Sequence, residues 1–122
     1  MNREPSATTM STNAAASTLF IRKLNDSFRS TFIGGTVMIT NGVEGLPALD
    51  RSTLLRAVRA FEAFNSDNDP HGEHDFGSID LDGSRYFWKI DYYDATMDGG
   101  SPDPSDPAVT RRVLTIMRAE EY

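Results

Sequence analysis

Residues 67–75 (DNDPHGEHD) concentrate carboxylates, amides and imidazoles, the side chains that hold hard or borderline cations. Four of them are spaced like the first half of a calcium-binding loop: Asp67, Asp69, His71 and Gly72. The second half does not follow, because Pro70 occupies the fourth position and Ser78 stands where such loops place a bidentate glutamate. The composition is that of a cation site, but the spacing does not predict calcium.

The two histidines of this stretch are the remaining metal candidates. His71 and His74 are three residues apart and would supply two imidazoles to zinc, with Glu73 or Asp75 as a third ligand. This spacing is common by chance. The alternative is that residues 67–69 form side-chain-supported turns between a helix and a hairpin. We favour the turns and predict neither a metal nor another cofactor, so that His71 and His74 stay weak metal candidates.

A hairpin is predicted directly after this stretch. The pair Asp82-Gly83 lies between two alternating segments, residues 76–81 and 84–93, and fits a two-residue type I′ turn. The register that follows gives one apolar face, made of Ile79, Leu81, Tyr86, Trp88, Ile90 and Tyr92. Gly77 stands opposite Trp88 and leaves room for the indole. This face is expected to join the core.

The other face of the hairpin holds the sharpest candidate for catalysis. Continued back along the strands, the register places His74 opposite Asp91, with Lys89 on the same face. A base, an orienting carboxylate and a cation would then lie within contact, as in a general acid–base centre. The open alternative is a polar cluster, satisfied internally, that serves only the fold.

Further elements are expected before the hairpin. Phe20, Leu24 and Phe28 recur at helical spacing, with Ile21 beside them, and predict a helix over residues 18–32. The β-branched run at residues 36–40 predicts a short buried strand. A second helix is expected from residue 47 or 50 to residue 64. Its buried face would be Leu54, Leu55, Val58, Phe61 and Phe64, and its solvated surface charges Arg51, Arg56 and Arg59.

The end of the chain predicts one more helix, over residues 107–119. Asp106 and Pro107 match an N-cap followed by proline at the first helical position. The helix would bury Val109, Val113, Ile116 and Met117, and would expose Arg111, Arg112 and Arg118.

These elements, in the order helix, strand, helix, hairpin, helix, predict an α+β fold. A three-stranded sheet, expected to be antiparallel and made of one strand plus the β-hairpin, would pack against three helices. Residues 17–122 are expected to form one domain. Residues 1–16 are rich in Ser, Thr and Ala and predict a disordered tail.

Composition excludes several classes of function. The 122 residues include no cysteine, which excludes a disulfide framework, a thiolate metal site and a cysteine nucleophile. No apolar run approaches the ~18 residues that span a bilayer, and no secretory signal is present, so we expect a cytoplasmic protein without a membrane role. No nucleophile elbow, phosphate loop or dinucleotide fingerprint indicates a named reaction.

Charge points to the class of partner. Residues 65–106 carry eleven acidic and two basic side chains, a net charge of −9 in a chain whose total is −6. Such a field repels nucleic-acid phosphates and attracts basic protein surfaces. We therefore expect a protein partner with a basic surface and no direct nucleic-acid binding. The binding candidates are Asp67, Asp69, Glu73, Asp75, Asp94, Asp98 and Asp103.

Long strings in the chain resemble a known family. IRKLNDSFR, DNDPHGEHDFG, DGSRYFWKIDYYD and DPAVTRRVLTIMRAEEY are similar to the bacterial domain-of-unknown-function family numbered 3768, over residues 19–122. The resemblance implies signature segments at residues 67–69, 72–77, 87–94 and 106–117, and an occurrence mainly in alphaproteobacteria, often on plasmids and other mobile elements. It implies no activity. Members are expected often to carry Tyr at position 71, which weakens a two-histidine site.

Two functions follow as expectations. The first is a non-enzymatic accessory protein of mobile elements that presents the acidic surface of residues 65–106 to a basic protein. The alternative is a small enzyme or metal-dependent hydrolase that uses His74, Asp91 and Lys89. We expect the first, so that catalysis is the less favoured reading, and the sequence does not indicate an oligomeric state.

Overall fold

A computed structural model describes the backbone of residues 5–122 and the side chains of residues 14–122. The helices are α1 (Pro5–Thr31), the single turn α2 (Asn41–Glu44) and α3 (Ala48–Arg59). The strands are β1 (Thr36–Ile39), β2 (Phe76–Leu81), β3 (Ser84–Tyr93) and β4 (Arg111–Arg118). Two 3-10 turns, Pro107–Val109 and Ala119–Glu121, flank β4. The α+β class is confirmed.

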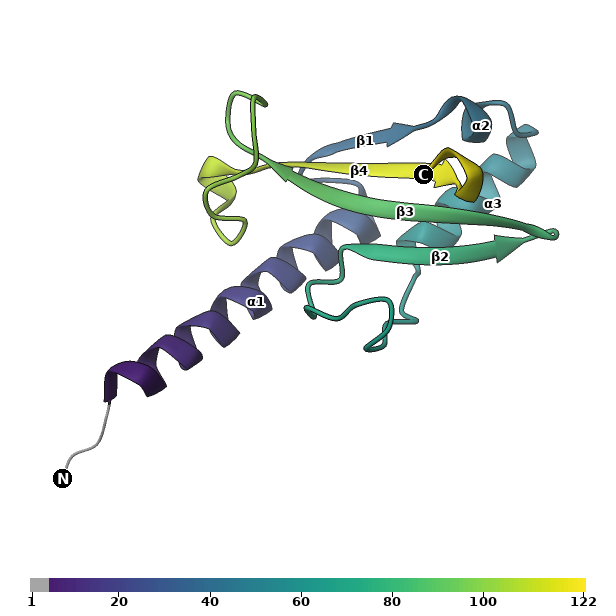
Figure 1. Ribbon diagram of the computed structural model, residues 1–122. Coiled ribbons are helices and arrows are strands. Elements are labelled where there is room, and N and C mark those ends of the chain that lie inside the picture. The colour runs from purple at the N-terminus through teal and green to yellow at the C-terminus, as the bar shows by residue number, and fades with distance from the viewer. Residues whose placement is uncertain (1–4) are drawn as a thin grey trace.

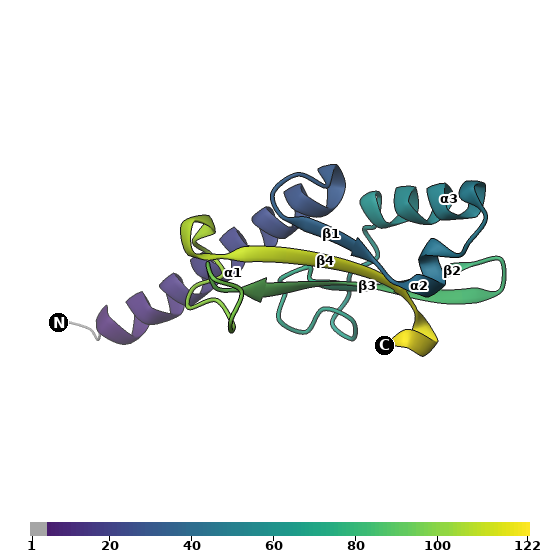
Figure 2. The same ribbon diagram turned by 90° about the horizontal axis from the view of Figure 1, so that it is seen from above.

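The four strands form one mixed sheet in the order β1-β4-β3-β2. β1 runs parallel to β4, while β3 is antiparallel to both β4 and β2. Figures 1 and 2 show α3 and the C-terminal part of α1 on one side of the sheet, with the C-terminal turn on the other. The expected sheet of three antiparallel strands is therefore wrong in strand number and in the direction of β1.

The difference comes from the last element, which is the central strand β4 and not a helix. Its residues are almost all buried: Arg112, Leu114 and Ile116 alternate with Val113 and Met117, so the strand has buried side chains on both faces. A strand buried on both faces reads as a continuous apolar run, so its residues also fit a helical spacing. The predicted cap does form, since Asp106 Oδ1 accepts a hydrogen bond from Ala108 N at 2.9 Å, but it starts a single 3-10 turn.

The hairpin has the predicted register between β2 and β3. Leu81 pairs with Ser84, and the ladder runs back to Phe76 opposite Lys89. The turn residues Asp82 and Gly83 have φ values of 51° and 80°, as a type I′ turn requires. The predicted apolar face is confirmed: Tyr86, Trp88 and Ile90 are buried, and Ile79, Leu81 and Tyr92 pack against them.

α1 covers the sheet with a face that agrees in part with the predicted one, at Ile21 and Phe28. Ile21, Asn25 and Phe28 are buried, whereas Phe20 is 61% exposed. The helix also begins at Pro5, well before the expected start at residue 18. Its N-terminal part extends beyond the edge of the sheet (Figure 1). The disordered tail stays a prediction, and its first four residues lie outside the described part of the chain.

α3 is shorter than expected and ends at Arg59. Phe61 and Phe64 nevertheless reach the core from the segment after the helix, where Phe61 packs edge-on against Trp88 with ring centroids 5.4 Å apart.

Within residues 5–122, no helix combines the length and the hydropathy that a membrane crossing requires.

Candidate functional site

The structure separates the three candidate catalytic residues. Lys89 and Asp91 alternate along β3 with the core residues Trp88 and Ile90, so they point to the face of the sheet that the helices leave open. His74 lies on the helix side, where its ring contacts α1. The expected pairing of His74 with Asp91 is not found.

The pairing fails because the ladder ends before it reaches His74. Asp75 still accepts a hydrogen bond from Ile90 N at 2.9 Å, but His74 has a φ of 56°, which turns the chain out of the strand. The carboxylate of Asp69 supports this turn by accepting a hydrogen bond from His74 N at 3.0 Å. The predicted pairing was extended from the hairpin turn on the assumption that the strand continues without interruption, and His74 interrupts it.

The imidazole of His74 lies between two carboxylates and is hydrogen-bonded through Nδ1. Nδ1 lies 2.8 Å from Asp26 Oδ1, and Nε2 lies 3.5 Å from Asp69 Oδ2. Asp26 also accepts a hydrogen bond from Arg29 Nη1 at 3.0 Å. The ring stacks on Phe64, and these side chains border a cavity of about 320 Å³. Through the contact of Nδ1 with Asp26, the imidazole ties the loop to α1.

Lys89 and Asp91 form their own pair on the open face of the sheet. The hydrogen bond to Asp91 raises the pKa of Lys89, so the amine stays protonated at neutral pH and is not a nucleophile there. The catalytic set proposed from the sequence is therefore not assembled at one place.

Beside His74, a buried polar network joins α1, β3, β4 and the loop before β2. Asn25 accepts a hydrogen bond from Arg112 Nε at 2.7 Å and donates to Tyr92 Oη at 2.8 Å. Tyr92 in turn donates to Glu73 Oε1 at 2.7 Å. Burial, followed by the hydrogen bond to Glu73, raises the pKa of Tyr92, so its hydroxyl remains a donor. Arg112, expected to be exposed, is instead 4% exposed, and burial lowers its pKa.

Two acidic loops leave the sheet near this network, residues 65–75 before β2 and residues 94–106 after β3. An arginine fastens each loop through a backbone carbonyl and not through a carboxylate. Arg22 Nε donates to Gly72 O at 2.6 Å, and Arg112 Nη2 donates to Pro104 O at 2.6 Å. Neither of these two contacts uses a carboxylate of the loops.

Several of these carboxylates fix the loops in place. Asp94 accepts hydrogen bonds from Thr96 N and Asp98 N at 3.1 and 3.0 Å, and these bonds, that of Asp98 first, lower its pKa. Asp103 accepts from Ser105 N at 3.1 Å. Asp67 and Asp98 are exposed at the surface. A side-chain-supported turn is present, but it starts at Asn65, whose Oδ1 accepts from Asp67 N at 2.8 Å, and not at residues 67–69.

The charge of this segment is not compensated within the fold. Its two basic residues, Arg85 and Lys89, pair with Asp80 and Asp91. No lysine or arginine in the described part of the chain forms an ion pair with the other nine acidic residues.

Residues 5–122 contain no group of three or more His, Asp or Glu side chains arranged to hold a metal ion. His71 is exposed and stands apart from the ring of His74.

A family model described as a protein of unknown function, DUF3768, matches residues 39–121. The chain belongs to this family. The match starts at the last residue of β1, so α1 lies outside it, although the resemblance of the strings began at residue 19. No curated protein and no solved structure matches the chain. Membership in DUF3768 thus confirms the resemblance and brings no activity with it.

Sequence reasoning missed the α1 residues that meet His74 and Arg112. Ile21, Asn25 and Phe28 recur at helical spacing and are all buried, which places Asn25 in the middle of the apolar face. A polar residue in that position needs a buried partner. That signal was present in the sequence of α1, but the partner, Arg112, is 87 residues away.

Proposed function

We propose that this DUF3768 protein is a non-enzymatic binding protein that docks a basic surface of another protein onto the acidic loops of residues 65–75 and 94–106. The observation that carries the proposal is the uncompensated charge of the segment: its two cations are used in local pairs, and nine carboxylates have no lysine or arginine partner among the described residues. A basic partner would supply the missing counter-charges.

The way the loops are held supports recognition and not solubility alone. Backbone hydrogen bonds to Asp94 and Asp103 fix the turns, and two arginines fasten the loops by their carbonyls. A partner would therefore meet charges whose positions are set before binding, which lowers the entropy cost of association.

We place this activity in the cytoplasm, as an accessory role in mobile elements. The cysteine-free composition is compatible with a reducing compartment.

The test compares two charge-matched variants. Asp67→Ser with Asp98→Ser removes two exposed loop carboxylates whose side chains fasten no turn. Glu44→Ser with Asp50→Ser removes two carboxylates near α3. A fluorescein-labelled peptide of alternating lysine and glycine is titrated by anisotropy at low and high salt, and each protein is also used to capture partners from its native host. We expect about fivefold weaker peptide binding for the loop variant only, and binding that falls with salt. Equal affinity of both variants, or capture of an acidic, salt-insensitive partner, would refute the proposal.

A further inference from the structure

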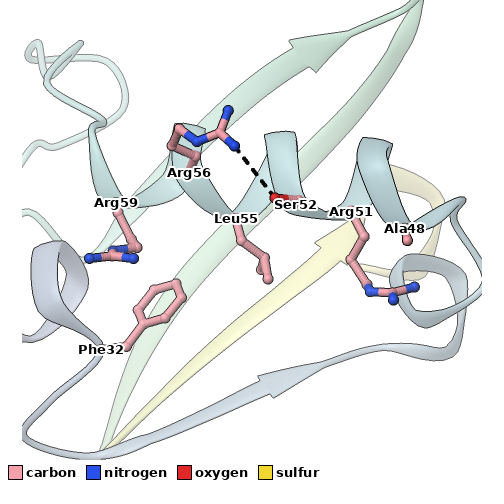
Figure 3. A pocket seen from close by; sticks show the side chains of 7 residues that line it. All are labelled: Phe32, Ala48, Arg51, Ser52, Leu55, Arg56 and Arg59. Carbon is pink, nitrogen blue, oxygen red and sulfur yellow. Dashed lines mark hydrogen bonds between the residues drawn. The ribbon is translucent and has the colours of Figure 1, made fainter.

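A groove lies between α3 and the end of α1, away from the acidic loops. Its volume is about 440 Å³, and its lining includes Phe32, Arg51, Leu55 and Arg59. Figure 3 shows Leu55 between Arg51 and Arg59 along one side of α3, with the ring of Phe32 beside Arg59, while Arg56 points away from them and bonds Ser52. The floor is apolar, and cations stand at both ends.

The arginines of this groove have no acidic partner. No ion pair joins Arg51, Arg56 or Arg59 to any carboxylate in the described part of the chain, whereas Arg85, Lys89 and Arg118 each have one. In a protein with a net charge of −6, α3 carries these three arginines and a single acidic residue, Asp50. They form the one strongly basic feature that α3 presents.

Two of these guanidinium groups are held in position by the backbone. Arg51 Nη1 donates to the carbonyls of Glu44 and Leu46, both at 3.0 Å. Arg59 Nε donates to Ser30 O at 3.1 Å, and its guanidinium lies 5.4 Å from the centroid of the Phe32 ring. Each guanidinium carries five N–H donors, so both keep donors for a ligand. Groups fixed in advance lose little side-chain entropy when a ligand binds.

The spacing of the lining indicates the shape of the ligand. Arg51, Leu55 and Arg59 recur every four residues, which is a rise of about 6 Å per step along a helix. In an extended peptide, alternate side chains on one face are about 6.6 Å apart. A strand-like segment laid along α3 would bring its first, third and fifth side chains beside these three residues.

We propose that this groove binds an extended acidic segment of a partner protein, with the pattern acidic–x–apolar–x–acidic. The two carboxylates meet Arg51 and Arg59, and the apolar side chain between them covers Leu55 and Phe32. Arginine recognises carboxylate with paired hydrogen bonds, and the apolar floor requires a side chain that a run of phosphates does not offer. The net negative charge of the protein also disfavours a nucleic acid.

The test uses a labelled peptide, Gly-Glu-Ser-Phe-Ser-Glu-Gly, and its counterpart with glutamine at both glutamates, in fluorescence anisotropy against the full chain. We expect the glutamate peptide to bind about tenfold more tightly, and this preference to disappear in the variant Arg51→Gln with Arg59→Gln. Lys23→Gln with Arg111→Gln removes the same charge elsewhere on the surface and is expected to keep the preference. Arg56→Gln gives up only one long contact to Ser52 at 3.5 Å and removes a cation that meets neither carboxylate, so it is also expected to keep the preference.

Four outcomes overturn the proposal. Equal affinity for the two peptides excludes recognition of carboxylate, and a preference that survives in the Arg51 and Arg59 variant places binding elsewhere. Tighter binding of a hexathymidine oligonucleotide than of the glutamate peptide, lost in the same variant, assigns the groove to nucleic acid. Salt-sensitive self-association in sedimentation, lost in that variant, assigns it to a second copy of the chain. None of these results bears on the acidic loops, so this inference and the proposed function fail or succeed separately.

Discussion

The imidazole of His74 lies flat against the ring of Phe64, with ring centroids 3.7 Å apart and the planes 1° from parallel. Phe64 follows α3 and His74 precedes β2, so this stack closes the base of the loop between them. Asp26 of α1 contacts the same imidazole at 2.8 Å. One aromatic side chain therefore joins three segments of the chain, and this relation defines what His74 does in the fold.

We predict that His74→Ala destabilises the protein by about 1–3 kcal/mol, because it removes the stack and leaves the carboxylates of Asp26 and Asp69 with fewer partners. Urea denaturation followed by circular dichroism measures the loss. His71→Ala changes an exposed histidine of the same loop and serves as the control, with no expected change. A His74→Ala protein as stable as the parent would show that the contacts to Asp26 and Phe64 do not secure the loop.

The contact between Asn25 and Arg112 predicts strong energetic coupling. Arg112→Met leaves the buried Asn25 Oδ1 without its donor, and Asn25→Leu leaves Arg112 Nε without its acceptor, so each single change should cost about 2–4 kcal/mol. The double variant leaves neither group unpaired in this contact and should cost less than the sum of the two. Urea denaturation of all four proteins gives the coupling energy. Additive losses would mean that the two side chains act independently.

The hairpin was predictable because everything that specifies it is local. Asp82 and Gly83 set the turn, and the alternation on either side sets the register and the buried face. The prediction failed where tertiary context decides. β4 has a pattern that fits both a buried helix and a strand covered on both faces, and only its pairing with β1 and β3 selects the strand.

The candidate site was predictable to a smaller extent. The sequence predicted that His74 would lie next to the carboxylate of Asp91. It lies next to the carboxylate of Asp26 instead, because the positive φ of His74 itself turns this residue to the helix side of the sheet. Arg112 was expected at the surface because an arginine in a helix would find solvent there. In the inner strand β4, Arg112 points toward α1 and bonds Asn25, which is 87 residues away in sequence. A contact between residues so far apart cannot be predicted from a local sequence pattern.

The half-buried carboxyl of Asp75 predicts a pH-dependent change in stability. Burial, together with the nearby charge of Glu73, raises the pKa of Asp75 above its ordinary value of 3.8. The folded state therefore carries a penalty at neutral pH that protonation removes. Asp75→Asn should stabilise the protein at pH 7, by at most about 1 kcal/mol because solvent reaches the carboxyl. The gain should shrink as the pH falls through the raised pKa and vanish below 3.8, where both states are protonated.

Melting temperatures between pH 3 and pH 7 measure this effect. Asp67→Asn removes the same charge from an exposed position of the same loop and shows how much of the gain comes from the overall charge alone. A gain from Asp75→Asn that persists unchanged at pH 3, or that equals that of Asp67→Asn at every pH, would exclude a burial penalty at Asp75.

Gly77 should be intolerant of even one added carbon, because β2 passes directly over the indole of Trp88. A Cβ at this position would collide with Trp88 Nε1 and would lie 2.8 Å from Phe61 Cζ, both of which belong to buried side chains. Overpacking of this kind costs about 1–3 kcal/mol, so Gly77→Ala should lower the urea midpoint clearly. Gly99→Ala, whose nearest neighbour lies 3.7 Å away, should cost much less.

The second variant in this test is Trp88→Phe. The indole Nε1 of Trp88 has no hydrogen-bond partner in the described structure, so replacing the indole leaves no new unpaired group. The smaller ring removes the atom that the new Cβ would meet, and Gly77→Ala should therefore cost less in the Trp88→Phe background than in the parent. The same cost in both backgrounds would show that the intolerance at Gly77 comes from the backbone of β2 and not from the contact with Trp88.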